Sequence, residues 1–106
     1  MSQTADRIAS LVMEQLDGLP VRSIRMMGGW LFYVEERIFG GIYDSEELMV
    51  RITDTSRRFL PDSLPEPPYP GAKPMLPCTI LDDRDKLRQM VMEMCPELPA
   101  RKPNKK

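Results

Sequence analysis

Histidine is missing from the 106-residue sequence, and cysteine is scarce. Without histidine there is no Ser-His or Cys-His pair and no side chain that ordinarily shuttles protons near neutral pH. The two cysteines, Cys78 and Cys95, lack the CxxC spacing of zinc and redox sites and are too few for a disulfide scaffold. The sequence therefore predicts no metal site, no cofactor and a reducing compartment.

Two further absences concern membranes and nucleic acids. No stretch approaches the roughly 18 apolar residues of a membrane-spanning helix, and Asp6 interrupts the region where a signal peptide would need an apolar core. Fifteen Lys and Arg stand against 16 Asp and Glu, a net charge of −1 that gives no attraction to polyanions. We expect a cytoplasmic protein with no membrane attachment, for which direct DNA binding is disfavoured.

Strand-forming residues are concentrated in the first half of the chain. Four runs rich in β-branched and aromatic residues cover 21–27, 30–34, 38–43 and 48–52. They are separated by two to four residues, a spacing typical of consecutive hairpins, and so predict an antiparallel meander. In the first strand we expect Ile24 and Met26 on a buried face and Ser23 and Arg25 on a solvated one.

Two details of the meander are left open by the sequence. Glu35 and Glu36 form the second turn, but they lack the Asn-Gly or Asp-Gly signal, so a longer loop that includes Arg37 is an alternative. Gly40 and Gly41 interrupt the third strand, where glycine usually marks a bulge or a close approach by another backbone.

Helical periodicity predicts a helix at each end of the domain. The apolar stripes are Ile8, Leu11, Val12 and Leu16 within 4–17, and Leu87, Met90, Val91 and Met94 after an acidic start at Asp82 and Asp83. Pro96 limits the last helix, so we expect Leu98 to pack just beyond its end. Thr53 or Asp54 can cap a short helix over 53–60.

A proline-rich segment separates the short helix from the last one. Residues 61–77 hold seven of the 11 prolines and predict a stiff, extended connector. A fifth strand is expected within 75–80, at a sheet edge because Pro77 lacks an amide donor. The predicted fold class is α+β: a single antiparallel sheet, with a four-strand meander plus a fifth strand, flanked by N- and C-terminal helices. We expect one domain over 1–98 and a disordered basic tail over 99–106.

No catalytic constellation emerges from the sequence. Its carboxylate pairs fall in predicted turns or at a helix start, where solvated turns and caps are the usual roles: Glu35 with Glu36, Glu46 with Glu47, and Asp82 with Asp83. Cys78 and Cys95 are expected to pack rather than react. The sequence predicts a protein that is not an enzyme.

Glycines beside basic residues form the candidate binding site. Gly28 and Gly29 can expose backbone amides beside arginines, and a lysine near a tyrosine and a glycine can add charge to the same edge. The candidate binding residues are Arg22, Arg25, Gly28, Gly29, Tyr69, Gly71 and Lys73. The sequence has neither the GxGxxG nor the P-loop pattern, so tight β-geometry is the alternative explanation of the two glycines. Met26, Met27 and Met92 could instead form an adaptable partner surface.

The segment RMMGGW at 25–30, with IFGGI at 38–42 and YPGAKPM at 69–75, resembles the N-terminal domain of the TfoX/Sxy family of bacterial competence regulators. The similarity covers about residues 4–98. Met27 stands where that family usually has an aromatic residue, and Pro77 with Cys78 alters the last strand. The family's full-length regulators carry a second domain that this sequence lacks.

The resemblance implies a helix-flanked antiparallel sheet and carries no catalytic residues. We therefore expect a non-enzymatic regulatory or protein-interaction module that binds a protein partner or itself, a homodimer being the simplest form of self-association. The alternative is a small-ligand or nucleotide-phosphate binding protein that uses the Arg, Gly-Gly and Lys edge.

Overall fold

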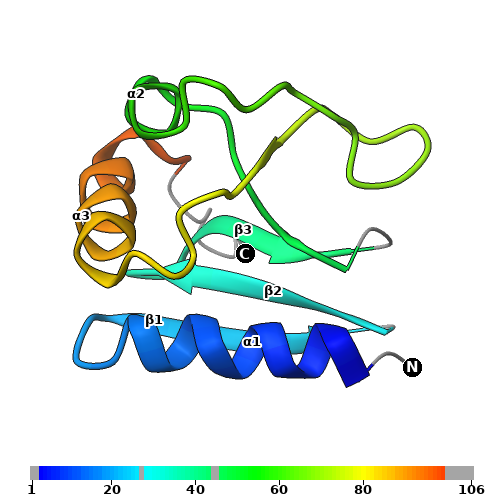
Figure 1. Ribbon diagram of the computed structural model, residues 1–106, viewed down its shortest axis with the longest axis horizontal. Coiled ribbons are helices and arrows are strands. Elements are labelled where there is room, and N and C mark those ends of the chain that lie inside the picture. The colour runs from blue at the N-terminus through cyan, green and yellow to red at the C-terminus, as the bar shows by residue number, and fades with distance from the viewer. Residues whose placement is uncertain (1–2, 27, 44–45, 100–106) are drawn as a thin grey trace, which may run out of the picture.

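A computed structural model of the chain describes residues 3–26, 28–43 and 46–99. Its elements are α1 (Gln3–Gln15), β1 (Val21–Met26), β2 (Gly29–Val34), β3 (Arg37–Ile42), β4 (Leu48–Val50), α2 (Asp54–Phe59), β5 (Leu76–Pro77), α3 (Arg84–Met94) and the 3-10 turn η1 (Cys95–Glu97). The strands form one antiparallel sheet in the order β1-β2-β3-β4-β5 (Figure 1). The predicted α+β fold is confirmed, with β5 at the edge as Pro77 requires.

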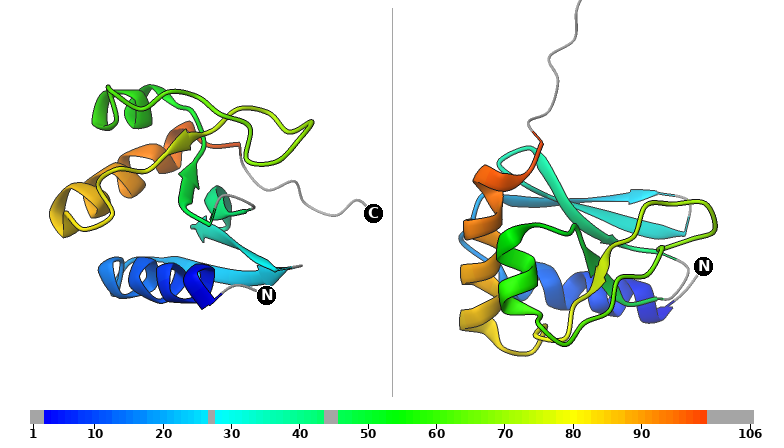
Figure 2. Two further views of the ribbon diagram at one scale, coloured as in Figure 1. Left: turned by 45° about the vertical axis from the view of Figure 1, so that its right-hand side comes forward. Right: turned by 90° about the horizontal axis from the view of Figure 1, so that it is seen from above.

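All three helices cover one face of this sheet, which we call the helix face. Residues 61–75, which we call the strap, run to the other side, the strap face (Figure 2, left). Side chains alternate along a strand, so Phe32 and Val34 point to the helix face and Tyr33 between them points to the strap face. Phe32 and Val34 are fully buried in one core with α1 and α3.

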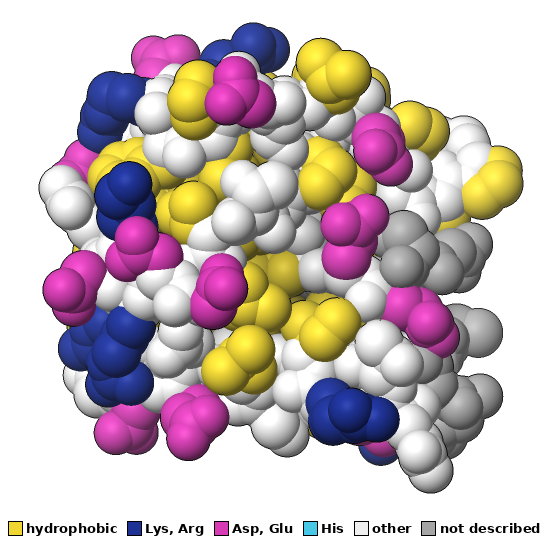
Figure 3. Space-filling model, in the orientation of Figure 1, with side chains coloured by type: hydrophobic (Ala, Val, Ile, Leu, Met, Phe, Trp, Pro, Cys, Tyr) yellow, Lys and Arg dark blue, Asp and Glu magenta, His cyan; other side chains and the backbone are white. Residues whose placement is uncertain are grey.

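The outer surface on the helix side carries mixed charge. In the view of Figure 3, hydrophobic side chains are visible in a hollow above α1, and acidic and basic side chains surround it. No helix in the described part of the chain is both long enough and apolar enough to cross a membrane. The predicted tail begins at Pro99, the last described residue, and its remainder lies outside the described residues, as does Met27.

The second hairpin is tighter than its sequence suggests. Val34 pairs with Arg37, so Glu35 and Glu36 alone form the turn, and the longer loop is wrong. Their φ values of 48° and 66° are the positive values that two-residue hairpin turns require at both central positions. Glu36 also forms an exposed ion pair with Arg22 of the neighbouring strand β1, which ties the turn to the sheet.

A β-bulge lies where the third strand contains two glycines. Phe32 pairs with Gly40 and Tyr33 with Ile38, so Phe39 is the extra residue on β3. A Cβ atom on Gly40 would clash with the backbone carbonyl of Met49 on β4. Both parts of the expectation, a bulge and a close backbone approach, are therefore confirmed.

The burial expected along β1 is wrong. Met26 is 46% exposed, and no residue of the strand is fully buried. Ser23 and Arg25 pair with Phe32 and Trp30 and therefore share the helix face, which leaves Ile24 and Met26 on the strap face. Alternation identified the two faces correctly, but only the position of α1 decides which face is covered.

The helical predictions hold with one exception. In α1 the buried line runs through Ala5, Ala9, Val12 and Leu16, whereas Leu11 is 36% exposed. Leu11 lies off this line, in which two alanines that the apolar stripe did not include take buried positions. Leu98 is buried just after η1, as expected.

Arginines from other elements complete the ends of α1 and α3. Neither helix has a basic residue in its own last turn. Arg84 of α3 donates to the Glu14 carbonyl at 3.1 Å. Arg88 donates to the carbonyl of Gln15, the last residue of α1, at 3.1 Å and to that of Asp17 just beyond it at 2.7 Å. Arg37 of β3 donates to the carbonyls of Cys95 and Leu98 at 3.0 and 3.2 Å. Helix ends leave carbonyls unpaired and carry partial negative charge, so these guanidinium groups stabilise the fold.

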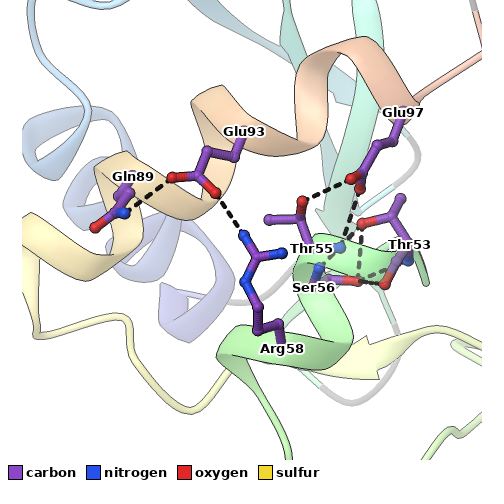
Figure 4. A network of polar contacts seen from close by, with 7 residues as sticks. All are labelled: Thr53, Thr55, Ser56, Arg58, Gln89, Glu93 and Glu97. Atoms are coloured by element: carbon purple, nitrogen blue, oxygen red, sulfur yellow. Dashed lines mark hydrogen bonds and ion pairs between the residues drawn. The ribbon is translucent and has the colours of Figure 1, made fainter.

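The start of α2 is held from both near and far along the chain. Thr53 and Ser56 form a reciprocal capping box, which confirms Thr53 as the cap. Glu97 accepts hydrogen bonds from the Thr55 amide at 3.0 Å and hydroxyl at 2.7 Å (Figure 4), and these bonds lower the pKa of its carboxyl. Arg58 adds an ion pair to α3. A helix of six residues is too short to be stable alone, and these contacts fix it to the domain.

Candidate binding site

The strap folds back on itself instead of running as a simple connector. Glu66 and Met75 exchange two backbone hydrogen bonds of 2.9 and 2.8 Å, which close the strap into a loop. The Ser63 hydroxyl donates to the Pro77 carbonyl at 2.6 Å and fixes the start of the loop to β5. Gly71 has a φ of +86° at the tip, which favours glycine. These contacts hold the far end of the strap over the sheet.

A cleft of about 380 Å³ lies between the strap and the strap face. This volume is near the lower end of the roughly 300–1,000 Å³ typical of small-molecule sites. The sheet side contributes Ile38, Tyr43, Arg51 and Ile52, and the strap contributes Pro68, Tyr69, Ala72, Lys73, Pro74 and Met75. Each wall therefore supplies one tyrosine and one cation.

Tyr43 reaches the cleft because the residue two positions earlier is glycine. Residues two apart on a strand share a face, so Tyr43 lies over Gly41. A Cβ atom on Gly41 would come within 2.8 Å of the Tyr43 hydroxyl oxygen and would also clash with the Trp30 carbonyl. The second glycine of the pair thus lets the tyrosine ring lie close to the sheet.

The two tyrosines of the cleft are in contact with each other. The ring centroids of Tyr43 and Tyr69 are 5.8 Å apart, and the rings are tilted by 51°, a favourable arrangement for an aromatic pair. Burial is the main cause that raises the pKa of Tyr43, with a further rise from Tyr69 and an opposing effect of Arg51. Tyr43 is therefore neutral at neutral pH and can donate a hydrogen bond from its hydroxyl.

The cations of the cleft differ from most arginines of the protein. Six arginines of the described chain have a carboxylate or carbonyl partner: Arg22, Arg25, Arg37, Arg58, Arg84 and Arg88. The side chains of Arg51 and Lys73 make no hydrogen bond or ion pair to any described residue. Among the described residues, no carboxylate lines the cleft. Its charge suits an anion.

The sequence-predicted arginines lie away from this cleft. Arg22 makes a bidentate pair with Glu36, at 2.7 and 2.8 Å, and stacks on Tyr33. Arg25 points to the helix face, where it lies 3.6 Å from Asp6 and over the Trp30 ring. The two arginines therefore stand on opposite faces of β1, and both are engaged within the fold.

The fold itself requires glycine at positions 28 and 29. Gly28 has a φ of +85° in the turn between β1 and β2. A Cβ atom on Gly29 would clash with the Ile42 carbonyl. Both positions thus require glycine whether or not a ligand binds near them.

The predicted set of binding residues therefore divides into two groups. Tyr69 and Lys73 line the cleft, and Gly71 shapes the strap between them. Sequence reasoning missed Tyr43 and Arg51. Tyr43 carried a usable signal, an aromatic residue two positions after a strand glycine, whereas nothing in the sequence shows that the strap folds over Arg51.

Neither cysteine has the environment of a nucleophile. Burial raises the pKa of the Cys78 thiol to about 11, so the reactive thiolate is scarce at neutral pH. Cys95 is buried in the core against the Val34 carbonyl. Within residues 3–26, 28–43 and 46–99, no three His, Cys, Asp or Glu side chains gather as a metal site would require.

Fold and cleft together define a small α+β domain whose sheet has helices on one face and a proline-rich strap on the other. The chain belongs to the same family as a protein of Spirochaeta aurantia described as "Uncharacterized 12.7 kDa protein in trpE 5'region". The two are 30% identical over 106 residues, which cover 99% of this chain and 91% of the relative. No protein-family model matches the chain. No solved structure matches it either.

Proposed function

We propose that this protein is a non-enzymatic binding module whose ligand is a small molecule held in the cleft beneath the strap. The observation that supports this most directly is the pair Arg51 and Lys73, which face one cleft from opposite walls without a protein partner among the described residues. Paired cations elsewhere in the fold stabilise helix ends and turns, but these two make no such contact with a described residue. A ligand would give them one.

The proposal takes up the small-ligand function that the sequence offered as the alternative to an interaction module, but it changes the site. The edge formed by Arg22, Arg25, Gly28 and Gly29 has its charges neutralised within the fold. The strap cleft retains Tyr69 and Lys73 of the predicted set and adds Tyr43 and Arg51.

Amide NMR spectra recorded with a metabolite library test this proposal. We expect shifts concentrated at Tyr43, Arg51 and the strap for at least one compound. Shifts confined to Gly28 and Gly29 would move the site back to the edge predicted from sequence. A library that leaves the cleft amides unchanged would overturn the proposal.

A second candidate is the regulatory interaction module that the resemblance to the TfoX/Sxy N-terminal domain implies. It is favoured by the part of the strap face that the strap leaves uncovered, where Met26 is 46% exposed and Ile24, Leu31 and Tyr33 are partly so. The adjoining strand β1 is also an edge of the sheet. An exposed edge strand is a template for strand pairing, so the occupant we propose is a second copy of the chain, paired through β1.

Sedimentation velocity over a range of protein concentrations tests the second candidate. Wild-type protein should dimerise, and Ile24→Glu on the proposed interface should make it monomeric. Leu11→Glu is the matched control, because Leu11 is an exposed apolar residue on α1. A wild-type monomer at all concentrations would remove the candidate.

A further inference from the structure

We propose that the ligand of the strap cleft is a small anion that carries a flat ring, with its phosphate or carboxylate group on Arg51 and Lys73 and its ring against Tyr69. This inference rests on the proposed function and adds the charge and shape of the ligand. Three features of the cleft lead to it.

The first feature is the placement of charge. Arg51 follows β4 on the strap face, and Lys73 lies on the strap, so their charges approach the cleft from two sides. Arginine offers a planar fork of donors and lysine a compact point charge, a combination that suits the several oxygens of one phosphate or carboxylate. No acidic side chain of the described lining competes for them.

The second feature is the apolar and aromatic remainder of the lining. Ile38, Ile52 and Met75 give the cleft a hydrophobic lining, and Tyr69 is 48% exposed, so that part of its ring is open to a ligand. Stacking of a flat ring on such a side chain is favourable and tolerates different ring types. A simple inorganic anion would leave this surface unused.

The third feature is the neutral hydroxyl of Tyr43. It is a hydrogen-bond donor that no described side chain engages, and it comes from the same wall as Arg51. A polar substituent on the ring, or an oxygen of the anionic group, can accept this bond. The cleft thus offers charge, stacking and one neutral donor within one small volume.

A ligand of this class would connect the two walls of the cleft. Arg51 and Tyr43 belong to the sheet, whereas Lys73 and Tyr69 belong to the strap. The backbone hydrogen bond from the Ala72 amide to the Tyr69 carbonyl, at 3.1 Å, lies in the strap between these contacts. Ligand binding should therefore slow hydrogen exchange of the Ala72 amide.

Four matched probes separate the parts of the inference: phenyl phosphate, benzoate, benzyl alcohol and inorganic phosphate. Affinities are measured by titration calorimetry and located by amide NMR shifts on the full chain. Phenyl phosphate or benzoate should bind at least about ten-fold more tightly than benzyl alcohol, because a hydrogen bond to a charged group contributes more than one to a neutral group. Which of the two anions binds better distinguishes a phosphate ligand from a carboxylate ligand.

Variants locate the anionic group and the ring. Arg51→Met should weaken binding of the preferred ring-bearing anion by about ten-fold, and the double variant with Lys73→Met by about a hundred-fold. Arg22→Met is the matched control and should leave affinity unchanged, because Arg22 lies on β1 and pairs with Glu36. Tyr69→Ala should weaken the ring-bearing anions several-fold but not inorganic phosphate. Native amide spectra of the variants show that they remain folded.

The outcomes distinguish the inference from the proposed function. If benzyl alcohol binds the cleft as tightly as either anion, or Arg51→Met has no effect, the anionic part of the inference is overturned while the cleft remains a binding site. If inorganic phosphate binds as tightly as phenyl phosphate, the proposal that the ligand carries a ring is overturned. If neither these probes nor the metabolite library shifts the cleft amides, the proposed function fails as well.

Discussion

The two faces of the sheet differ in what their charged side chains do. On the helix face, Arg37, Arg84 and Arg88 donate to carbonyls at helix ends, and Glu97 accepts from the start of α2. On the strap face, Arg51 has no such partner among the described residues and faces a cleft. On the strap face, Arg22 still pairs with Glu36, but Arg51 and Lys73 face the cleft instead of a helix end. Under the proposed function, this difference separates stability from binding in a domain too small to have two cores.

Truncation of one methionine on each face should give the largest losses of stability, and the two losses should differ. Met90 is fully buried in the core between α3 and the sheet, whereas Met75 is 9% exposed at the base of the strap. Met90→Ala should cost about 3–4 kcal/mol and Met75→Ala about 2 kcal/mol or less, because a loop collapses into a cavity more readily than a packed helix. Urea unfolding measures both, and equal losses would show that the strap face is as tightly packed as the core.

Glycine substitutions compare the sheet with the strap. A Cβ on Gly40 meets the Met49 backbone, so Gly40→Ala should force β3 and β4 apart at a cost of about 2–3 kcal/mol. Gly71 has free space around it but a positive φ, so Gly71→Ala should cost about 1 kcal/mol. Thermal unfolding tests the order, which would be reversed if backbone strain outweighed the clash.

Removal of one arginine from each face tests the division of roles directly. Arg37→Met leaves the carbonyls of Cys95 and Leu98 without their donor and should cost about 1.5–2 kcal/mol. Arg51→Met should change stability by no more than about 0.5 kcal/mol, because its side chain makes no bond within the described fold. A comparable loss in Arg51→Met would mean that the cleft cation is structural.

The pH dependence of stability should reveal Glu97 as a small contribution on the helix side. Hydrogen bonds from Thr55 lower the pKa of its carboxyl in the folded state, so its contribution is present above the unfolded pKa of about 4.3 and is lost as pH falls through the folded value. Glu97→Gln should be less stable than wild type at pH 7, and the difference should shrink under acidic conditions. Urea midpoints at several pH values measure this, and a difference independent of pH would contradict it.

Much of the fold could be predicted because its local signals agree with one another. Alternating apolar residues and short gaps identify the meander, and Thr53, one of the two expected caps, marks the start of α2. The failures concern contacts between distant segments. Leu11 and Ile24 have the right periodicity for burial, but burial depends on where α1 lies, and no local pattern encodes that position.

The candidate site was less predictable than the fold. Proximity in sequence grouped Arg25 with Gly28 and Gly29, yet Arg25 turns to the helix face and approaches Asp6. The cleft is instead formed by two segments that are far apart in the sequence: Tyr43 and Arg51 lie on one wall, and Tyr69 and Lys73 lie on the other. Sequence reasoning recovered its strap side because Tyr69 and Lys73 stand out beside a turn glycine.

The sequence alone determined which segments become strands and helices, because side-chain periodicity, caps and proline act over a few neighbouring residues. Only the tertiary structure decided which face of the sheet the helices cover and where the strap lies. It therefore also decided which cations are neutralised and which are left facing a cleft. Local chemistry cannot settle that choice, since a guanidinium group on a strand becomes structural or available according to what distant segment packs beside it.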